Sequence, residues 1–428
     1  MKTAIIGLGY VGLPLSIQFA KSGIEVLGLD IDSEKAKLLN RGESYIKHIG
    51  SQAIGEMVEN GNFEASTDFS RVAECQAAII CVPTPLNKNR EPDISYVLSS
   101  AEAIAPSLQA GTLVTLESTT YPGTTDTELR EVLEKGSCLT AGKDFHLAYS
   151  PEREDPGNPD SKVAIIPKVV GGYTPACQDK AIELYSKAIQ TMVPVGTCRA
   201  AEATKLTENI FRSVNIALVN ELKVIFDAMD IDIWEVINAA KTKPFGFMPF
   251  YPGPGLGGHC IPIDPFYLTW KAREYEHNTR FIELAGEINT AMPDYVIGKV
   301  SDALNEQKKS INGSKILILG LAYKPNVDDD RESPSYILLE KLKAKGAEVA
   351  YYDPHVPVIP MTREHPQWAG TKSITWDQRN LESFDTVVIS TSHDAVDYWQ
   401  LADWCPSIVD TRNAMTGLEI KPGQVIKA

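Results

Sequence analysis

The first part of the chain alternates short apolar runs with stretches in which apolar residues recur at helical spacing. TAIIGLG, EVLGLD, AAIICVP and TLVTLES have the length and composition of buried strands, and HLAYSPE and KVVGG follow as later strands. Strands that alternate with helices pair in parallel and are covered on both faces. The pattern therefore predicts a doubly wound α/β domain over residues 1–195.

The pattern changes near residue 196. Residues 199–231 contain neither Gly nor Pro and carry apolar residues at helical spacing, which predicts one long helix. Residues 243–265 are rich in Pro and Gly and too irregular for a core element, so we interpret them as a functional loop. Helical sequence then continues to about residue 308, and residues 196–308 are expected to form a helical middle domain.

Three glycines near the N-terminus have the spacing of a dinucleotide-binding turn. Gly7, Gly9 and Gly12 spell GLGYVG between the first strand and a helical stretch. The first glycine permits a tight turn, the second lets the backbone approach a pyrophosphate, and the third lets helix and strand pack closely. Asp30, at the end of the next strand, can accept hydrogen bonds from the adenosine ribose and would repel a 2′-phosphate, which favours NAD over NADP. The alternative for Asp30 is a turn or helix cap, a role that Asp32 fits better.

A second α/β pattern begins at Ser314. KILILGLAYKP, AEVAYYDP, DTVVIST and SIVDTRN repeat the alternation over residues 309–428. KILILGLAYKP lacks the second and third glycines of the fingerprint, so this unit is expected to be a nucleotide-binding relative of the first and not a second NAD site. The expected fold is two Rossmann-like doubly wound α/β domains joined by a long central helix and a helical middle domain.

Charge and cysteine usage narrow the class of protein. The chain has 41 basic and 56 acidic residues, and its net charge of −15 opposes binding to nucleic acid or to anionic membranes. It lacks a run of about 18 apolar residues, and glycines interrupt its apolar N-terminus, so neither a membrane span nor a signal peptide is expected. Seven scattered cysteines without a CxxC pair indicate a reducing compartment, the cytoplasm, and no metal site.

Cys260 is the cysteine whose surroundings indicate chemistry. It lies in GLGGHCIPIDP, where glycines allow a substrate to approach closely; a buried structural cysteine is the usual alternative. Asp264 follows four residues later, as a base or orienting carboxylate or as the cap of a turn before Pro265. The segment therefore predicts covalent catalysis by the thiol.

Two further segments carry polar residues suited to acyl chemistry. Lys205 and Asn209 are four positions apart on the predicted long helix, so they share a face and can stabilise an oxyanion together; exposed helix surface is the alternative. Glu152 in YSPERE can activate water, with a solvated charge as the alternative.

Two loops at the ends of strands are expected to border the cofactor. Pro83 and Thr84 belong to CVPTP, which follows the third apolar strand. Thr120 in ESTTYPG can hold a water molecule or contact nicotinamide, or it is an ordinary turn hydroxyl.

These motifs resemble the UDP-glucose/GDP-mannose dehydrogenase family. GLGYVG, CVPTP, ESTTYPGT, YSPE, AAEATKLTEN, GLGGHCIPID, LAYKPNVDDDRES and VDTRN occur in the family's order and span nearly the whole chain. PFGFMPFYPGPGLGGHCIPIDP is most similar to the UDP-N-acetylglucosamine 6-dehydrogenase branch. The resemblance implies an enzyme that uses two NAD molecules to oxidise the C6 hydroxymethyl group of UDP-N-acetylglucosamine, giving UDP-N-acetylglucosaminuronate for surface polysaccharides such as lipopolysaccharide.

The resemblance also implies roles for the candidate residues. The Cys260 thiolate adds to a bound aldehyde, and oxidation of the thiohemiacetal leaves a thioester. Asp264, a water held by Thr120, or Lys205 assists the first deprotonation. Glu152 or Asp264 activates the water that hydrolyses the thioester. The expected catalytic residues are Cys260, Lys205, Asn209, Asp264, Glu152 and Thr120.

The family pattern further implies binding contacts and assembly. The expected cofactor contacts are Gly7, Gly9, Tyr10, Val11, Gly12, Asp30, Lys35, Pro83, Thr84, Thr119, Thr120 and Arg331. The expected UDP-sugar contacts are Glu152, Arg153, Lys205, Asn209, Phe250, Tyr251, Gly253, Gly257, Tyr323, Lys324 and Arg412. Members usually form dimers or larger assemblies through the long helix, so a homodimer or larger homo-oligomer is expected.

Three departures bear on the identity of the sugar. UDP-glucose enzymes commonly have Lys immediately before the catalytic Asp, where this chain has Ile263, and here His259 precedes Cys260. Pro156 stands where those enzymes often have a second Glu. These differences favour an N-acetylhexosamine. UDP-N-acetylmannosamine, UDP-N-acetylgalactosamine, UDP-glucose and GDP-mannose are the alternative substrates, and a catalytically silent NAD-binding regulatory protein is the alternative of another class.

Overall fold

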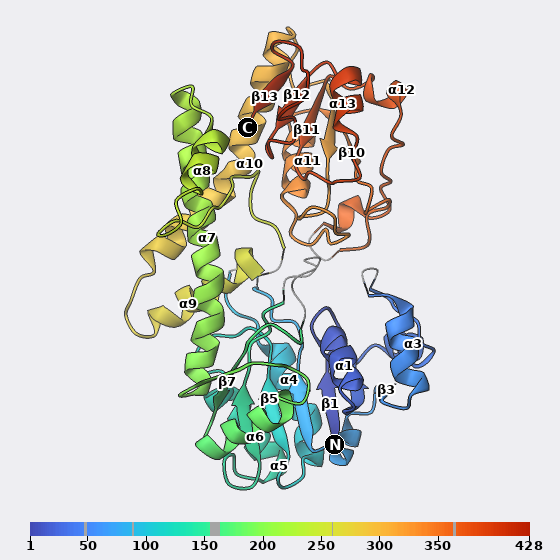
Figure 1. The fold of residues 1–428 in the computed structure, drawn as a ribbon, viewed down its shortest axis with the longest axis vertical. Helices are drawn as coiled ribbons and strands as arrows, with labels where there is room; N and C mark the ends of the chain where they lie inside the picture. Colours follow the sequence, from blue (N-terminus) through green and yellow to red (C-terminus); the bar gives the residue numbers. More distant parts are fainter. Residues whose placement is uncertain (47–48, 88–89, 155–162, 259, 363–364) are drawn as a thin grey trace. The chain divides into compact units, whose positions relative to one another are not determined.

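The computed structural model describes residues 1–46, 49–87, 90–154, 163–258, 260–362 and 365–428. They divide into two compact units, one formed by Met1–Asn209 with Ile263–Asn278 and the other by Ile210–Pro262 with Thr279–Ala428. Each unit contains a β-sheet with helices on both faces (Figure 1). The predicted α/β class with two doubly wound sheets is confirmed.

The sheet of the first unit has the strand order β3-β2-β1-β4-β5-β6-β7-β8. Neighbouring strands are parallel except β6 and β7, which pair antiparallel. The order reverses between β1 and β4, and the carboxyl ends of strands at such a switch point border the usual ligand site of this architecture. The strands are β1 Lys2–Ile6, β2 Glu25–Leu29, β3 Phe63–Ser66, β4 Ala77–Ile80, β5 Leu113–Leu116, β6 His146–Tyr149, β7 Lys168–Gly172 and β8 Met192–Val195.

Alternate residues of these strands enter two separate cores. Ile5 packs with α1, α2, α3 and α6, whereas Ala4 and Ile6 pack with α4, α5 and the start of α7. Because both faces of the sheet are covered, its strands are continuous apolar runs. The helices are α1 Gly12–Lys21, α2 Ser33–Asn40, α3 Ser51–Glu59, α4 Ser95–Ile104, α5 Arg130–Ser137 and α6 Pro175–Tyr185, with short turns η1 Phe69–Glu74, η2 Ala105–Ser107 and η3 Thr125–Leu129.

The sheet of the second unit is parallel throughout, in the order β10-β9-β11-β12-β13. Helices α10 and α11 pack on one face, and α12 and α13 pack on the other. The elements are β9 Lys315–Leu319, β10 Glu348–Tyr352, β11 Thr386–Ile389, β12 Ile408–Asp410, β13 Val425–Lys427, α10 Arg280–Glu306, α11 Pro334–Ala344, η4 Pro366–Trp368, α12 Gln378–Leu381 and α13 Tyr398–Trp404.

The middle of the chain contains α7 (Cys198–Ala228), α8 (Ile233–Ala240) and α9 (Cys260–Arg273). Helix α7 confirms the predicted long helix. The expectation that residues 243–265 are irregular throughout is wrong at their end, because α9 already begins at Cys260. Pro262 lies in the first turn of α9, where a missing backbone N–H costs little. Pro265 lies inside the helix and removes one backbone hydrogen bond, but the helix continues past it.

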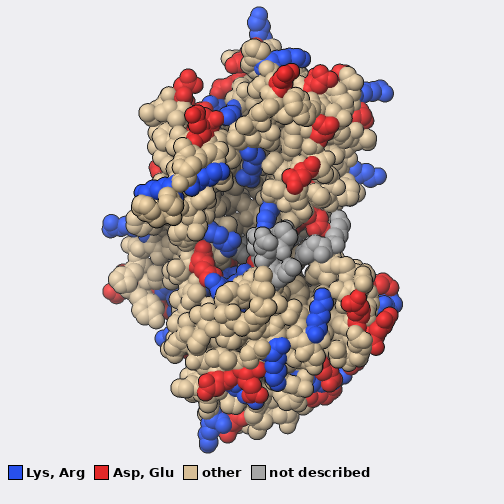
Figure 2. All heavy atoms as spheres, viewed as in Figure 1, with Lys and Arg blue, Asp and Glu red and all other residues tan. Residues whose placement is uncertain are grey.

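The described surface carries charges of both signs. On the face shown in Figure 2, Lys and Arg side chains are interspersed with Asp and Glu side chains. Within the described ranges, no helix combines the length and apolar character required to cross a bilayer.

Candidate active site

The turn between β1 and α1 has the geometry of a phosphate cradle. Gly7 has φ +89°, and a Cβ on it would lie 2.7 Å from the carbonyl oxygen of Cys81. A Cβ on Gly12 would lie 1.9 Å from the carbonyl oxygen of Gly7, so neither glycine can be replaced without backbone movement. In contrast, a Cβ on Gly9 would meet nothing within 4 Å. Open space at a helix N-terminus fits the diphosphate of NAD.

Asp30 holds this turn from the end of β2. Its Oδ2 accepts the N–H of Leu8 at 3.0 Å, and its Oδ1 accepts the N–H of Asp32 at 3.0 Å. A carboxylate has about four lone-pair positions, so Asp30 keeps acceptor capacity for ribose hydroxyls. Lys35 Nζ lies 3.8 Å from Asp30 Oδ2. Asp32 is the N-cap of α2, accepting the N–H of Glu34 at 2.9 Å.

The remaining predicted cofactor residues of the first unit follow β4 and β5 or lie in the turn between β1 and α1. Thr120 is fully buried, and no described residue hydrogen-bonds its Oγ1, so that hydroxyl fits a bound water or ligand group. Thr84 is buried and its carbonyl accepts the Tyr267 hydroxyl at 2.8 Å. Pro83 is exposed, Thr119 is half-buried, and Tyr10 and Val11 are half-buried against the core.

Glu202, which sequence reasoning missed, anchors the loop that follows Thr120. Its carboxylate accepts the N–H groups of Gly123 and Thr125 at 2.6 and 2.9 Å and the Thr125 hydroxyl at 2.7 Å. Burial raises the pKa of Glu202 to about 7, although these three donors oppose the shift. The loop is therefore fixed by a carboxyl group that titrates near neutral pH. No local pattern in the sequence pairs Glu202 with residues so far away along the chain.

Helix α7 brings its two predicted catalytic residues to partners on other segments. Lys205 is buried and donates to the Glu152 carbonyl at 2.5 Å, with Glu152 Oε2 at 3.4 Å. Asn209, one turn later, donates its side-chain N–H to Asp264 Oδ2, and both residues are almost fully buried. An ammonium and a carboxamide on one face, each oriented by a carboxylate residue, can stabilise an oxyanion.

Arg153, a predicted substrate contact, pairs with another residue of α7. Its Nη2 lies 2.6 Å from Glu208 Oε1, and its Nη1 donates to the Pro167 carbonyl at 2.7 Å. The guanidinium is therefore oriented by the protein itself.

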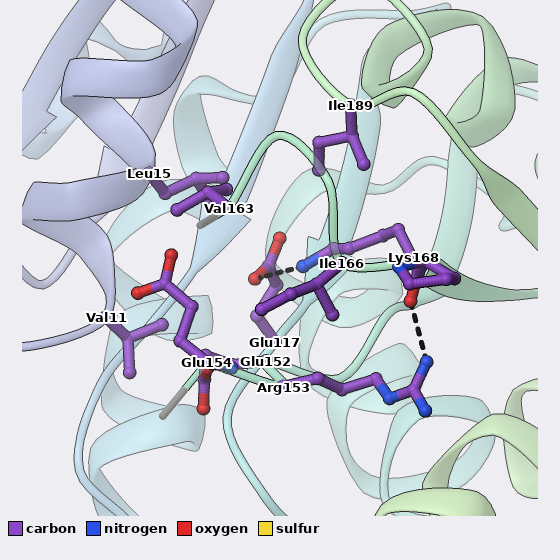
Figure 3. Close-up of a pocket in the computed structure, with 11 residues that line it drawn as sticks. Val11, Leu15, Glu117, Glu152, Arg153, Glu154, Val163, Ile166, Lys168 and Ile189 are labelled. Carbon is purple, nitrogen blue, oxygen red and sulfur yellow. Dashed lines mark hydrogen bonds and ion pairs between the residues drawn. The ribbon is translucent and has the colours of Figure 1, made fainter. Parts of the chain in front are cut away.

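A pocket lies beside the start of α1 (Figure 3). One wall is a buried network that the sequence did not reveal: Lys168 Nζ lies 2.7 Å from Glu117 Oε2, and the Tyr185 hydroxyl donates to Glu117 Oε1 at 2.6 Å. Glu154 also lines the pocket, where burial and then the charge of Glu152 raise its pKa to about 8. Glu154 is therefore a carboxyl group able to hold a proton at neutral pH.

Cys260 is the first residue of α9, one helical turn before Asp264. Its side chain lies outside what the structure describes, as do His259 and Pro156 as whole residues. The backbone position matters by itself, because the N-terminus of a helix stabilises a thiolate.

The second unit brings together several predicted UDP-sugar contacts that are far apart in sequence. A Cβ on Gly253 would lie 2.4 Å from Arg412 Nη1, and a Cβ on Gly257 would lie 2.6 Å from Tyr323 Cβ. Glycine is thus required for the loop to approach Tyr323, and a larger residue at position 253 would displace the Arg412 guanidinium. Arg412 Nε donates to the Ser390 carbonyl at 2.7 Å. Burial lowers the pKa of Arg412 to about 10, which leaves the guanidinium charged at neutral pH.

The other predicted residues of this unit have separate surroundings. Phe250 packs edge-on against Phe211 of α7, and Tyr251 stacks on Trp234 of α8 with ring centroids 5.4 Å apart. Lys324 is half-buried beside Tyr323 in the loop after β9. Arg331, predicted to reach the cofactor, forms a bidentate ion pair with Asp329 at 2.8 and 2.6 Å.

Three stretches of the chain match one protein family. Residues 1–189, 199–291 and 317–417 match, in turn, the NAD binding, central and UDP binding domains of the UDP-glucose/GDP-mannose dehydrogenase family. The chain is 36% identical over 357 residues to UDP-N-acetyl-D-glucosamine 6-dehydrogenase of Pseudomonas aeruginosa, with 83% of each chain covered. It is 38% identical over 369 residues to UDP-N-acetyl-D-mannosamine dehydrogenase of Escherichia coli K12, covering 83% of this chain and 86% of the relative. The solved structure of a UDP-D-ManNAc dehydrogenase from Pyrococcus horikoshii gives a TM-score of 0.90 at 31% identity, over 100% of this chain and 99% of that one.

Proposed function

Because the chain belongs to the UDP-glucose/GDP-mannose dehydrogenase family, we propose that it oxidises the C6 hydroxymethyl group of UDP-N-acetylglucosamine to a carboxylate. NAD, for which the first unit provides the binding domain, supplies the hydride acceptor for both oxidations. The observation that carries the proposal is the pairing of Lys205 with Glu152 and of Asn209 with Asp264 along α7. A protein that only bound NAD would have no need for these four buried or half-buried polar groups.

The first oxidation requires a proton acceptor for the C6 hydroxyl. Asp264, a water held by the Thr120 hydroxyl, and Lys205 are the three candidates within the first unit. The unsatisfied Thr120 Oγ1 supports the water-mediated route, since a buried hydroxyl is normally hydrogen-bonded. The Asn209 amide already donates to Asp264 and orients that carboxylate for the same task.

The second oxidation proceeds through Cys260. The thiolate sulfur forms a bond to the aldehyde carbon, and the Lys205 ammonium and Asn209 amide stabilise the resulting oxyanion. Loss of hydride from this thiohemiacetal leaves a thioester, and water activated by Glu152 or Asp264 then breaks the C–S bond, releasing carboxylate and thiol. The start of α9 at Cys260 supports the thiolate form.

The UDP portion is proposed to bind the second unit, and Arg331 to reach the cofactor. Arg412 and Lys324 carry the positive charge that a diphosphate requires. Gly253 and Gly257 support this assignment, because each allows the loop backbone to lie directly against Arg412 or Tyr323.

Two kinds of relative bear on the identity of the sugar. Relatives of similar identity are named for UDP-N-acetyl-D-glucosamine and for UDP-N-acetyl-D-mannosamine, so an N-acetylhexosamine is supported by both. The segment PFGFMPFYPGPGLGGHCIPIDP favours the glucosamine epimer. The product would then serve surface polysaccharide synthesis.

We test the proposal by counting NADH per sugar consumed with UDP-GlcNAc, UDP-ManNAc, UDP-GalNAc, UDP-glucose and GDP-mannose. Two NADH per UDP-GlcNAc, with the highest kcat/KM of the panel, is the expected result. One NADH per sugar would mean that oxidation stops at the aldehyde. A higher kcat/KM for UDP-ManNAc would reassign the epimer, and silence across the panel would favour a regulatory NAD-binding protein.

Cys260→Ala tests the covalent step. The variant should lose carboxylate formation by about 10³-fold or more while still binding NAD. Cys138→Ala is the matched control, because Cys138 is an exposed free cysteine outside the candidate site. Full activity in the Cys260 variant would exclude the thioester route.

We also propose that the protein works in the cytoplasm as a homodimer or larger homo-oligomer, with three functional segments over residues 1–195, 196–308 and 309–428. Phe211, Leu218 and Ile225 support the oligomer, because they are exposed apolar residues at helical spacing along α7. Light scattering of the wild type and of Leu218→Glu should show a smaller assembly for the variant. Equal masses would show that this row of exposed apolar residues is not part of the interface.

A further inference from the structure

The loop after β9 in the second unit is fixed at its start and again at Asn326. At its start, Asp353 Oδ2 accepts the N–H groups of Leu321 and Ala322 at 2.6 and 2.8 Å. The carbonyl of Ala322 accepts the Thr391 hydroxyl at 2.7 Å. Tyr323 and Lys324 follow these anchors directly. Within the loop, the N–H of Tyr323 donates to the Asp329 carbonyl at 3.0 Å, and the N–H of Asn326 is held by a side chain from another segment.

The backbone N–H of Asn326 donates to His393 Nδ1 at 3.0 Å. The imidazole is fully buried, and its Nε2 lies 3.1 Å from Asp353 Oδ2. Because Nδ1 receives a backbone N–H, it must be the unprotonated nitrogen, and the proton must reside on Nε2, which donates to Asp353. One neutral imidazole therefore connects both anchors of the loop, one through each nitrogen.

A second pair of contacts beside His393 holds the same loop residue. Asp394, the next residue, holds the Asn326 side chain on both sides: Asn326 Nδ2 donates to Asp394 Oδ2 at 2.8 Å, and the Asp394 N–H donates to Asn326 Oδ1 at 2.9 Å. Asn326 has φ +62°, in the left-handed region that Asn tolerates better than most residues, and its side-chain hydrogen bonds stabilise this conformation. Side-chain hydrogen bonds from Asp394 and His393 therefore hold the conformation of this loop at Asn326.

We propose that His393 is a positioning residue for UDP-sugar binding: its Nδ1 acceptor fixes the backbone at Asn326 and so holds Tyr323 and Lys324 in place for the uridine diphosphate. The inference rests on the proposed function, which assigns the UDP contact to Tyr323 and Lys324. It goes further by naming a buried residue that touches neither cofactor nor substrate and sets substrate affinity through hydrogen-bond direction.

Two substitutions separate the roles of the two ring nitrogens. An Asn side chain can place its oxygen near the position of Nδ1, so His393→Asn keeps an acceptor for the Asn326 N–H and loses the donor to Asp353. A Gln side chain can place its amide N–H near Nε2, so His393→Gln keeps that donor and loses the acceptor. Asp353 has further backbone donors, from His355 at 2.7 Å and Val356 at 3.0 Å, and tolerates loss of the imidazole better than Asn326 does.

The measurements are the Kd for UDP by calorimetry and the KM for UDP-GlcNAc and NAD, all on the full chain. His393→Gln should raise the UDP Kd and the UDP-sugar KM about tenfold, while kcat at saturation and the NAD KM stay within about twofold. His393→Asn should stay within about twofold of the wild type throughout. Hydrogen exchange should show the Asn326 amide protected in the wild type and in His393→Asn and unprotected in His393→Gln.

Each other outcome overturns the inference in a recognisable way. Equal effects of the Asn and Gln substitutions on UDP binding would show that His393 matters only for packing. A ¹⁵N-histidine spectrum of the wild type with the proton on Nδ1 would contradict the hydrogen-bond direction even if a variant failed to fold. Failure of the wild type to bind UDP would refute the proposed function together with the inference, whereas wild-type-like UDP binding by folded His393→Gln would refute the inference alone.

Discussion

The first strand of each unit is followed by a turn of the same backbone geometry, but the two turns have different surroundings. Gly7 after β1 has φ +89°, and Gly320 after β9 has φ +87°. The N–H of each donates at 2.8 Å to the last residue of the neighbouring strand, Leu29 in one unit and Tyr352 in the other. A Cβ at either position would collide with a backbone carbonyl of a third segment. The shared geometry shows that the backbone of the nucleotide-binding turn survives in both units.

The carboxylates that face these turns differ in the number of hydrogen bonds that they accept. Asp30 accepts two backbone N–H groups, whereas Asp353 accepts four, and His393 in addition. Asp353 has therefore no capacity left for a ribose hydroxyl. The turns also lead to different elements: α1 starts at Gly12 directly after the first turn, but residues 321–333 separate the second turn from α11. The first unit keeps a cofactor cradle, and the second replaces it with a loop that carries polar side chains.

The largest expected effect comes from Gly12→Ala. The new methyl group would lie 1.9 Å from the Gly7 carbonyl oxygen, so β1 and α1 must separate. We expect a loss of about 4 kcal/mol in the free energy of unfolding and loss of NAD-dependent activity, measured by urea unfolding and NADH production.

Gly9→Ala is the matched control for that substitution. Its methyl group meets no protein atom within 4 Å, so unfolding should be unchanged while the NAD KM rises at least about tenfold, because the methyl group occupies the cradle. An unchanged NAD KM in Gly9→Ala would show that the diphosphate lies elsewhere.

Replacing Asp by Asn should have different effects in the two units. Asp353→Asn leaves buried N–H donors unsatisfied and should cost about 3 kcal/mol in the free energy of unfolding, with the NAD KM unchanged. Asp30→Asn should raise the NAD KM about tenfold and change stability by less than about 1 kcal/mol. The comparison fails if both variants change stability equally, or if Asp353→Asn weakens NAD binding in a folded protein.

Some of this contrast was readable from sequence and some was not. GLGYVG and Asp30 predicted the first turn because the fingerprint is local, and the spacing of Lys205 and Asn209 placed them on one face of a predicted helix that the structure confirms. The anchoring partners were not predicted: Glu202 for residues 123–125, Lys168 for Glu117, and His393 for Asp353. Each pairs residues from distant segments, and only the folded sheet brings them together.

The prediction from sequence was also wrong at the end of the Pro/Gly-rich segment, residues 243–265. Glycines and prolines before Cys260 suggested an irregular loop through Pro265, because both residue types disfavour helix interiors. The first turn of α9 tolerates Pro262, and the helix continues through Pro265 although that proline removes one backbone hydrogen bond. Which side chains surround the thiol depends on packing that residue spacing cannot specify.

The anchors of the two loops should respond to pH in different ranges. Burial raises the pKa of Glu202 from 4.5 to about 7, so the folded state binds this proton more tightly than the unfolded state. The contribution of Glu202 to stability is therefore complete below pH 4.5 and lost as pH rises through about 7, by about 2 kcal/mol between pH 5 and 8. The His393 hydrogen bond lowers the pKa of Asp353, whose contribution is instead present above its unfolded pKa near 3.8 and lost only in stronger acid.

Glu202→Gln isolates this effect. The difference in the free energy of unfolding between wild type and variant should shrink as pH rises from 5 to 8, measured by urea unfolding at each pH. Hydrogen exchange in residues 118–125 should follow the same trend, and exchange in residues 321–326 should not. Parallel stability curves for the two proteins would mean that Glu202 does not titrate in this range.

The smallest expected effect is at Lys35, which pairs with Asp30 beside the first turn. Its Nζ lies 3.8 Å from Asp30 Oδ2, and its side chain is 37% exposed, so the pair contributes at most about 1 kcal/mol. Lys35→Met should raise the NAD KM no more than about threefold at low salt and less at high salt, because ions screen an exposed pair. Lys37→Met is the control, since Lys37 pairs with the exposed Glu34 and should leave the NAD KM unchanged. An increase above about tenfold would mean that the cofactor contact of Lys35, predicted from the sequence, contributes more than its exposed ion pair with Asp30.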